Sequence, residues 1–285
     1  MIIKNDFDLS LYNSYRIKSI CKQAFFPESE QDIKTLYNNK QDYILLGSGH
    51  NIIFSKSYYD NDFIIFNGNF NTLKLDKTSN TVSAEAGATI QDISELALKN
   101  SLSGAEFFYD IPSSVGGAVV MNAGTKEGET QQILKKVRYL DLDDLIVKEK
   151  MKKEINFEYR NSFFQKNKNK IILKAWFQLE PGNYKSINHV MQESKERRWA
   201  KQPREYPNCG SVFKRPPGRY VGPMIDELGL KGYTIGGAQV SSKHSGFIIN
   251  IGSATGQDIL SLIKYIKSKV LKRFGVDLEV EQRII

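Results

Sequence analysis

The stretch YILLGSGHN, residues 43–51, carries an apolar strand pattern directly into two glycines and a polar pair. Glycine accepts backbone conformations with φ > 0 and lets several N–H groups point at one spot, which suits a phosphate or pyrophosphate. An ordinary tight turn explains the same residues. A third glycine and a following apolar helix are missing, so the stretch is not a Rossmann fingerprint.

A second segment of this kind is IPSSVGGAVVMNAG, residues 111–124. Small residues dominate it and apolar ones are interleaved, so a flat ligand or another backbone can approach closely. A glycine-rich β-bulge is the alternative interpretation. Two small-residue segments that follow strands in one chain favour a large nucleotide cofactor.

The rest of the chain mixes strand and helix patterns. Short apolar runs predict strands at 43–46, 63–66, 115–121, 137–142 and 171–179. Helical spacing predicts helices over 89–100, opened by a Thr89/Asp92 capping box, over 185–199, and over 257–274, capped by Thr255. One apolar stripe runs along the last helix: Ile259, Leu262, Ile263, Ile266, Val270 and Leu271. We therefore predict an α+β fold.

Length and composition exclude several classes of protein. The chain has 285 residues, enough for about two domains. Two cysteines, Cys21 and Cys209, and three histidines are too few for a disulfide framework or a zinc site, so we expect no metal. No run reaches ~18 apolar residues, which excludes a membrane span. Because Asp6 and Asp8 interrupt the start where a signal peptide needs an apolar run, we expect a cytoplasmic protein.

A formal net charge of +8 favours anionic partners such as a nucleotide or a phosphorylated substrate. The densest basic run, residues 166–174, flanks a strand pattern and is interpreted as a solvated hairpin tip. A nucleic-acid binder usually shows a dense basic patch with a reader element, and we expect no nucleic acid as a partner.

Three further motifs carry polar residues, and each has an ordinary interpretation. Arg160, in EYRNS (158–162), is by default a surface ion-pair partner. Ser211 follows a glycine, but Phe213 stands where a nucleophile elbow requires a second glycine. Glu279 and Glu281 share one face of a strand and are by default solubilising.

Taken in order, seven motifs nevertheless resemble one family over nearly the full length. They are NSYRI (13–17), LLGSGHN (45–51), GAEF…IPSSVGGAVVMNAG (104–124), YRNSFF (159–164), KQP…NCGSVFK (201–214), GLKG…GGAQVSSKHSGFIIN (229–250) and LEVEQR (278–283). The chain resembles the UDP-N-acetylenolpyruvoylglucosamine reductase (MurB) family of bacterial cell-wall synthesis.

The resemblance implies a two-part FAD-binding domain of the vanillyl-alcohol-oxidase (PCMH) type and a C-terminal α+β substrate-binding domain. The expected boundaries are 1–66, 67–202 with 276–285 returning to it, and 203–275. It also implies non-covalent FAD, NADPH as co-substrate, and reduction of UDP-N-acetylglucosamine enolpyruvate to UDP-N-acetylmuramate. We expect a monomer. Only forty residues separate Arg160 from Lys201, so we expect the shorter, second type of the family, without an extra folded insertion or a covering tyrosine loop.

Matching positions imply the site residues. Arg160 resembles the family's arginine that meets the substrate carboxylate, and Glu281 resembles the protonated carboxyl that acts with this arginine. Ser211 resembles the family's proton donor. Neighbouring cations such as Lys201 or Lys231 would assist the serine hydroxyl. The expected cofactor-binding residues are Gly47, Ser48, Gly49, His50, Asn51, Ser113, Ser114, Gly116, Gly117, Asn122, Ala123 and Gly124. The expected residues for the substrate or NADPH are Tyr159, Lys201, Asn208, Lys214, Lys231 and His244.

Four positions depart from the family pattern. His50 replaces a serine, Asp110 and Ser113 replace glycines, and Arg215 replaces an asparagine. Two other functions stay open: a flavin oxidase of the same fold acting on another sugar or alcohol, and a non-catalytic nucleotide-binding protein. Retention of all three expected catalytic residues favours the reductase over both.

Overall fold

The computed structural model describes residues 1–39 and 41–285, and their contacts divide the chain into two compact units. The first unit comprises Met1–Lys4, Ala24–Ser48 and Asn61–Glu196, and the second comprises Asn5–Gln23, Gly49–Asp60 and Arg197–Ile285. The chain passes from one unit to the other several times, so neither is a single stretch. The domain boundaries expected from the sequence stay predictions, while the fold class is α+β, as predicted.

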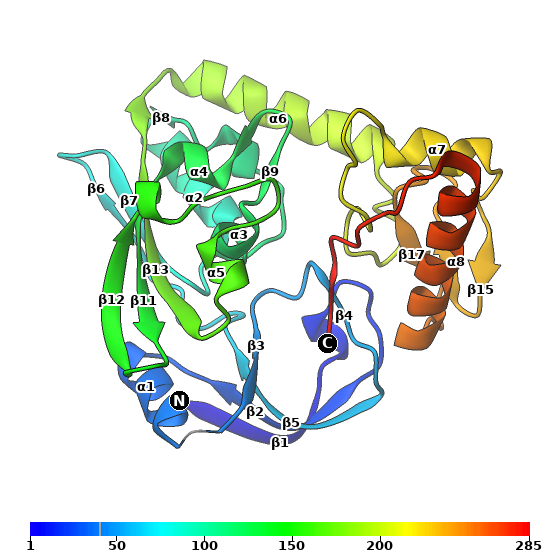
Figure 1. Ribbon diagram of the computed structural model, residues 1–285. Helices are drawn as coiled ribbons and strands as arrows, with labels where there is room; N and C mark the ends of the chain where they lie inside the picture. The colour runs from blue at the N-terminus through cyan, green and yellow to red at the C-terminus, as the bar shows by residue number, and fades with distance from the viewer. Residues whose placement is uncertain (40) are drawn as a thin grey trace. The chain divides into compact units, whose positions relative to one another are not determined.

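A five-stranded antiparallel sheet, in the order β12-β11-β13-β7-β6, forms the framework of the first unit (Figure 1). Its strands are β6 (Leu73–Asp76), β7 (Thr81–Glu85), β11 (Leu134–Asp141), β12 (Ile146–Met151) and β13 (Lys170–Gln178). Along β13, buried Leu173, Ala175 and Phe177 alternate with partly exposed Lys174 and Trp176. One face of the sheet therefore joins the core and the other carries polar side chains.

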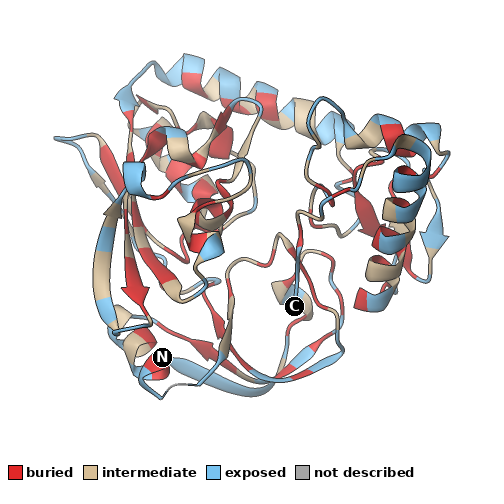
Figure 2. Ribbon diagram, viewed as in Figure 1, coloured by how far each residue is buried: buried red, intermediate tan, exposed pale blue. Residues whose placement is uncertain are grey.

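Two helices contribute to the core on the buried side of this sheet (Figure 2). Helix α2 (Ile90–Lys99) begins at the predicted Thr89/Asp92 capping box. Helix α3 (Val115–Met121) contacts β7 and β13, and the prediction of a strand over these residues was wrong. Ser114 caps α3, and its buried positions follow the i, i+3, i+4 spacing of a helix. A short apolar run does not distinguish a strand from a buried helix.

A four-stranded sheet in the order β1-β2-β5-β3 consists of β1 (Ile2–Asp8), β2 (Ile20–Phe26), β5 (Tyr58–Ile65) and β3 (Tyr43–Leu46). Strand β3 pairs in parallel with β5, from Tyr43 opposite Asp62 to Leu46 opposite Ile65. Helix α1 (Glu30–Asn38) lies between β2 and β3 in the chain, and the Ser29 side chain caps it. The predicted strands at 43–46 and 63–66 thus lie side by side, and the first leads directly into Gly47.

The second unit contains a three-stranded antiparallel sheet, β15 (Thr234–Ile235), β16 (Ala238–Val240) and β17 (Ile248–Asn250), against which helix α8 packs. Helix α8 (Gly256–Phe274) is capped by Thr255, as predicted, and the structure adds a capping box with Asp258. Its buried stripe has the predicted members except Leu271, which is 50% exposed. Helix α7 (Val221–Glu227) contacts α8.

The strand expected to carry Glu279 and Glu281 is not formed, since Val280 makes only an isolated bridge with Phe213. Strand β18 (Arg283–Ile284) pairs in parallel with β4 (Ile52–Ile53), so the C-terminal residues meet a segment of the predicted 1–66 subdomain rather than 67–202. Helix α6 (Tyr184–Lys201) extends over the predicted helix at 185–199. The remaining short elements are η1 (Ser10–Tyr12), β8 (Leu102–Ser103), η2 (Glu106–Phe108), β9 (Gly124–Thr125), β10 (Gly128–Glu129), α4 (Thr130–Ile133), η3 (Lys152–Glu154), α5 (Phe163–Lys166) and β14 (Glu180–Pro181).

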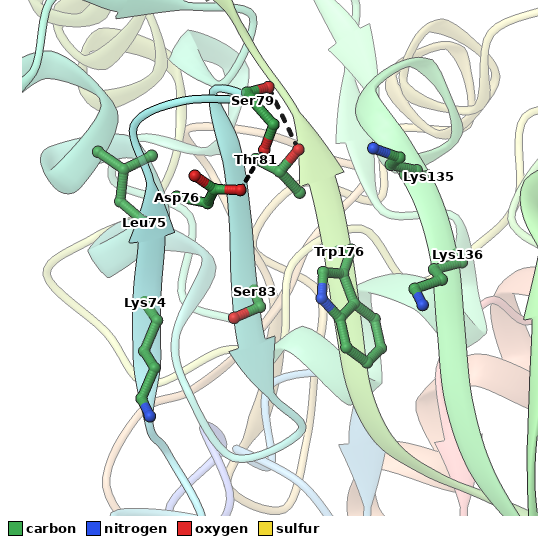
Figure 3. Close-up of a pocket in the computed structure, with 9 residues that line it drawn as sticks. All are labelled: Lys74, Leu75, Asp76, Ser79, Thr81, Ser83, Lys135, Lys136 and Trp176. Carbon is green, nitrogen blue, oxygen red and sulfur yellow. Dashed lines mark hydrogen bonds between the residues drawn. The ribbon is translucent and has the colours of Figure 1, made fainter.

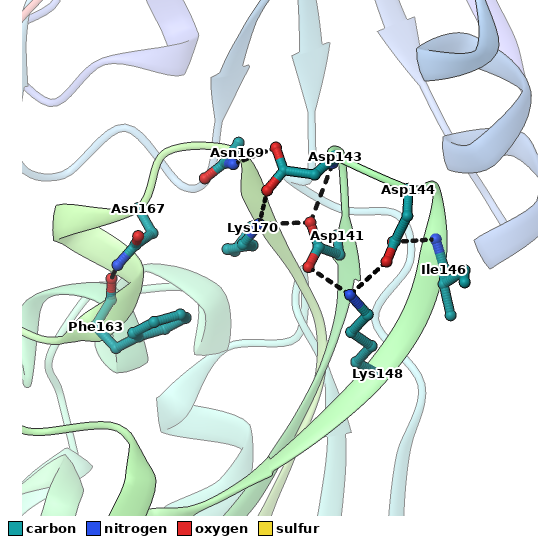
Figure 4. A network of polar contacts seen from close by, with 9 residues as sticks. All are labelled: Asp141, Asp143, Asp144, Ile146, Lys148, Phe163, Asn167, Asn169 and Lys170. Carbon is teal, nitrogen blue, oxygen red and sulfur yellow. Dashed lines mark hydrogen bonds and ion pairs between the residues drawn. The ribbon is translucent and has the colours of Figure 1, made fainter.

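The basic run at 166–174 is not a solvated hairpin tip, because it connects α5 to β13 and its Lys170 belongs to a partly buried ion-pair network (Figure 4). The Asp141 carboxylate, 8% exposed, pairs with the ammonium groups of Lys148 and Lys170. Burial alone would raise the pKa of this carboxyl, but the hydrogen bonds from both lysines outweigh burial and hold the pKa below its usual range. The Lys170 side chain is only 11% exposed.

Candidate active site

In the first unit, the glycine turn after β3 lies against the start of α3. The Ser48 hydroxyl accepts a hydrogen bond from the Ser114 N–H (2.9 Å), and the Ser114 hydroxyl accepts one from the Gly117 N–H (3.3 Å). A Cβ on Gly47 would lie 2.6 Å from Ser114 Oγ. Two of the predicted cofactor segments are therefore brought together, at a separation that only glycine at position 47 permits.

The neighbouring predicted residues serve packing. The Gly116 N–H donates to the Ala86 carbonyl, and a Cβ on Gly116 would lie 3.3 Å from the Ala86 Cβ. The Ser113 hydroxyl donates to the Ser114 carbonyl oxygen at 3.1 Å. Gly116 thus allows α3 to approach the segment after β7, which holds the start of α3 in place.

Arg160 stands at the tip of a tight turn between Glu158 and Asn161, whose backbones exchange two hydrogen bonds. It has a left-handed backbone (φ 54°), a conformation that costs energy in a residue other than glycine and is frequent at functional sites. Its guanidinium lies 5.4 Å from the centre of the half-exposed Tyr159 ring and donates to the Gly124 carbonyl at 3.0 Å. The structure thus brings Arg160 together with two other predicted site residues.

Asn122 has a structural role in the same region. It ends α3 in a left-handed conformation, and its buried side chain donates to the Glu129 carboxylate and the Glu158 carbonyl. Ala123 follows it, and its carbonyl accepts hydrogen bonds from the Thr130 backbone and side chain. These contacts fix the backbone that carries Gly124.

In the second unit, the same glycine turn continues against residues 12–16. Gly49 has φ 72°, and a Cβ there would lie 2.0 Å from the Tyr12 carbonyl oxygen. The Ser14 N–H donates to the Gly49 carbonyl (3.0 Å), and the Ser14 hydroxyl is hydrogen-bonded to His50 Nδ1. Burial, helped by the positive charge of Arg16, lowers the pKa of His50 to about 4. His50 is therefore neutral at pH 7.

Ser211 and Glu281 lie on neighbouring extended segments. The Glu281 N–H donates to the Val212 carbonyl at 2.8 Å, and Phe213 forms a bridge with Val280. Ser211 is exposed and Glu281 is partly buried. Asn51, a predicted cofactor residue, donates from its side chain to the Glu281 carbonyl.

Gln282 is a residue of this site that the sequence reasoning missed. Its buried side-chain amide donates to the carbonyls of Cys209 (3.1 Å), Gly210 (3.3 Å) and Ser211 (3.4 Å), and it accepts from the Tyr15 hydroxyl (2.9 Å). It thereby holds the backbone that presents Ser211. Its place beside Glu281 in the LEVEQR motif was the available signal.

The charges of Lys201 and Lys231 act on His244, a third predicted binding residue of the second unit. Burial lowers the pKa of His244, and the charges of Lys231 and Lys201 lower it further, while Asp226 opposes them. Asp226 also pairs with Lys231 at 3.3 Å. The His244 ring meets the Phe247 ring edge-on at 4.7 Å, and Phe247 forms a bridge with Ser211.

Two other predicted binding residues have partners within the protein. Lys214 pairs with Glu279 at 2.7 Å. The Asn208 side chain donates to the Pro203 and Tyr206 carbonyls and accepts from the Gly210 N–H. Asn208 thus organises the turn that leads to Ser211, and a ligand of Lys214 has to compete with Glu279.

A shallow hollow on the polar face of the five-stranded sheet is lined by none of the predicted residues (Figure 3). Its lining residues are Lys74, Leu75, Asp76, Ser79, Thr81, Ser83, Lys135, Lys136 and Trp176. Lys136 Nζ lies 4.6 Å from the centre of the Trp176 ring and also pairs with the Glu149 carboxylate. The charge of Lys136 therefore already has partners within the protein. Among residues 1–39 and 41–285, no cluster of three histidine, cysteine or acidic side chains is arranged to hold a metal ion, and no helix is long and apolar enough to span a membrane.

The model of an FAD binding domain matches residues 22–148, and the model of the UDP-N-acetylenolpyruvoylglucosamine reductase C-terminal domain matches residues 202–285. The chain is 43% identical over 279 residues to a UDP-N-acetylenolpyruvoylglucosamine reductase of Francisella tularensis subsp. tularensis, covering 97% of this chain and 98% of that relative. It is 41% identical to one of Limosilactobacillus reuteri subsp. reuteri, covering 99% and 95%. The crystal structure of UDP-N-acetylenolpyruvylglucosamine reductase (MurB) from Thermus caldophilus superposes with a TM-score of 0.86 at 28% identity, covering 100% and 99%.

Proposed function

The chain belongs to the UDP-N-acetylenolpyruvoylglucosamine reductase family, and we propose that it reduces UDP-N-acetylglucosamine enolpyruvate with electrons from NADPH. It is an FAD-dependent oxidoreductase, a UDP-N-acetylmuramate dehydrogenase of peptidoglycan synthesis. Its length fits the shorter, second type of the family. Between Arg160 and Lys201 the chain forms only α5, β13, β14 and α6, which leaves no room for an inserted supersecondary unit.

The residues of the glycine turn fit a dinucleotide cofactor. Ser114 Oγ and the Tyr12 carbonyl lie where Cβ atoms at positions 47 and 49 would be, so the packing of the turn itself requires glycine at both positions. A turn rich in glycine can direct several backbone N–H groups at one point, which suits a diphosphate. We infer that Gly47–Asn51 and Ser113–Gly117 hold FAD without a covalent bond. When bound, FAD supplies the hydride transfer from NADPH to the substrate.

Arg160, Glu281 and Ser211 act on the enolpyruvyl group. Reduction of this group builds up negative charge on the carbon beside its carboxylate, and fixed positive charge and donors stabilise that charge. Arg160 binds the carboxylate, protonated Glu281 donates a hydrogen bond to its oxygen, and the Ser211 hydroxyl delivers the proton to carbon. The observation that supports these roles best is the pairing of the Glu281 and Val212 backbones, which holds the serine and the carboxyl on adjacent segments.

We assign Lys201, Lys231 and the neighbouring His244 to the diphosphate of the substrate or of NADPH. The charges of the two lysines lower the pKa of His244 and favour an anion beside it. The expectation of a monomer remains a prediction, which light scattering coupled to size exclusion checks.

The test separates the two half-reactions under anaerobic conditions. NADPH should bleach the flavin of both wild-type protein and Ser211→Ala. The enolpyruvyl substrate should then reoxidise only the wild type rapidly, since the serine serves only the second half-reaction. Glu281→Gln should also slow only reoxidation. Equal loss in both halves would give Ser211 another role, and rapid reoxidation by oxygen without response to the substrate would favour an oxidase.

A further inference from the structure

The guanidinium of Arg160 rests on the hairpin that β9 and β10 form in the first unit. Its Nη2 donates to the Gly124 carbonyl at 3.0 Å, and Gly124 lies opposite Glu129 in the hairpin. A Cβ on Gly124 would lie 2.2 Å from the Gly128 carbonyl oxygen and 2.6 Å from the Glu129 Cα, so the two backbones are in direct contact. The place of the Gly124 carbonyl, and with it that of the guanidinium, therefore depends on β10.

The side chain of Glu129 leads from this hairpin to the turn that carries Arg160. Glu129 Oε2 accepts hydrogen bonds from Asn122 Nδ2 at 2.9 Å and from Gln131 Nε2 at 2.8 Å. Asn122 is fully buried; its Nδ2 also donates to the Glu158 carbonyl at 3.2 Å, and its Oδ1 accepts from the Gln131 N–H at 3.0 Å. Both polar atoms of the Asn122 side chain are thus engaged, and Glu129 helps to orient the amide that holds Glu158.

The turn at 158–161 has a buried side and an exposed side. On the buried side, the Asn122 amide holds the Glu158 carbonyl, and the buried Ser162 hydroxyl donates to a carbonyl of α3 at 2.8 Å. On the exposed side, the Glu158 carboxylate pairs with Lys166 at 2.5 Å, and both side chains are more than half exposed. Because an exposed ion pair contributes little, the contacts on the buried side decide the conformation of the turn.

Glu129 therefore meets Arg160 at both of its ends. Its backbone faces the glycine whose carbonyl accepts from the guanidinium, and its carboxylate orients the amide that holds the backbone of the turn. A carboxylate accepts hydrogen bonds and donates none, and its charge strengthens the bonds from both amides. We propose that Glu129 is a positioning residue that keeps the Arg160 guanidinium in the orientation that binds the carboxylate of the enolpyruvyl substrate. This inference rests on the proposed role of Arg160.

The left-handed backbone of Arg160 (φ 54°) is the reason why its turn needs this support. A residue other than glycine keeps such a conformation only where its surroundings hold it. Without the Glu129 carboxylate, the amides of Asn122 and Gln131 lose a shared acceptor, so the turn can relax and the guanidinium can leave the Gly124 carbonyl. A displacement of about 1 Å at a group that binds the substrate can cost about 100-fold in rate.

The experiment measures the two half-reactions of the flavin and the affinity of the oxidised protein for the enolpyruvyl substrate. Glu129→Ala should slow substrate-driven reoxidation by about 30-fold and weaken substrate binding by about tenfold, while bleaching by NADPH stays within about twofold. Glu129→Gln keeps a neutral acceptor and should recover part of the rate, to about fivefold below wild type.

Two matched controls should leave both half-reactions within about twofold of wild type. Lys166→Gln removes the exposed ion pair of the same turn. Glu95→Gln changes an exposed carboxylate of α2 that also accepts from a glutamine side chain, that of Gln91. Losses in either control as large as those in Glu129→Gln would reduce the effect to net charge and overturn the positioning role.

A double-mutant cycle separates positioning of Arg160 from a general loosening of the fold. If Glu129 acts through Arg160, Glu129→Gln should cost less than about twofold in reoxidation when it is added to Arg160→Lys. The full loss of about fivefold in that background would show that Glu129 acts independently of the arginine and would overturn the proposal.

The Arg160 Nε–H signal in nitrogen-15 NMR, assigned by its loss in Arg160→Lys, supplies a readout that does not depend on turnover. It should shift in Glu129→Gln and stay in place in Lys166→Gln. An unmoved arginine signal, or equal loss in bleaching and reoxidation, would overturn the positioning role. Wild-type protein whose reduced flavin does not respond to the substrate would overturn the proposed function, whereas a responsive wild type matched by both Glu129 variants would overturn the positioning role alone.

Discussion

Replacing Gln282 by alanine tests how the fold presents Ser211. The Gln282 side chain makes hydrogen bonds to three successive carbonyls, those of Cys209, Gly210 and Ser211, and to the Tyr15 hydroxyl. Gln282 and Tyr15 are both buried, so water does not replace the lost partner freely. The truncation leaves the Tyr15 hydroxyl and the Cys209 carbonyl as the most buried groups that lose a bond.

Each buried polar group left without its partner costs about 1–3 kcal/mol. Two such groups give an expected loss of about 4 kcal/mol in the free energy of unfolding, a large share of the 5–15 kcal/mol typical of a folded domain. Gln282→Glu keeps an acceptor for the Tyr15 hydroxyl but places a carboxyl group against three carbonyls. Its loss of unfolding free energy should be smaller than that of Gln282→Ala. The loss should grow as pH rises, because the ionised carboxylate repels the carbonyl oxygens.

Urea unfolding of Gln282→Ala, monitored by fluorescence, gives the stability. Gln257→Ala, an exposed glutamine in the first turn of α8, is the control and should change it by less than about 0.5 kcal/mol. Gln282→Ala should also slow substrate-driven reoxidation of the flavin more than its bleaching by NADPH, because the loosened backbone carries Ser211. A variant within about 1 kcal/mol of wild type, with both half-reactions slowed equally, would refute the positioning role.

Arg160→Lys should slow reoxidation by roughly 100-fold, because lysine keeps the charge and loses the planar fork; near-normal turnover would place the carboxylate elsewhere. Gly49→Ala should lower the stability by about 3 kcal/mol or more, since its Cβ would meet the Tyr12 carbonyl at 2.0 Å; unchanged urea unfolding would contradict this. The lowered pKa of Asp141 means that its ion pairs stabilise the fold above the unfolded-state value of about 4 and that this contribution is lost as pH falls through the folded-state value; Asp141→Asn should show a flatter loss of stability in acid. Acid precipitation should release all the flavin, because we expect His50, whose Nδ1 is hydrogen-bonded to Ser14, to contact the cofactor only through hydrogen bonds; a yellow pellet would overturn that.

Features that depend on neighbours in the chain were predictable. The capping boxes at the starts of α2 and α8 need only residues three positions apart, and the structure has both. The apolar stripe of α8 was predicted for the same reason. Leu271 is the exception because it lies roughly 120° around the helix from Ile259, outside the arc of about 100° that the buried members share. The order of seven motifs was sufficient to identify the family.

The strand prediction over residues 115–121 failed because a short apolar run carries no period that separates strand from helix. The Ser114 cap and the close approach of Gly116 to Ala86 favour the helix. The contact with Ala86 exists only after the sheet has formed. The interpretation of the basic run at 166–174 as a solvated hairpin tip failed for a related reason, since Lys170 pairs with Asp141 at the end of β11 and with Asp143 in the turn that follows it.

By itself, then, the sequence determined the elements with local signals, the family, and the residue types of the site. Only the tertiary structure decided what the polar side chains of that site contact. Gln282 is 71 residues or more from each of its side-chain partners along the chain, and His50 is 36 residues from Ser14. The state of His50 and the hold on Ser211 depend on burial and on hydrogen bonds between segments far apart in sequence, and no local pattern encodes the distance between such segments.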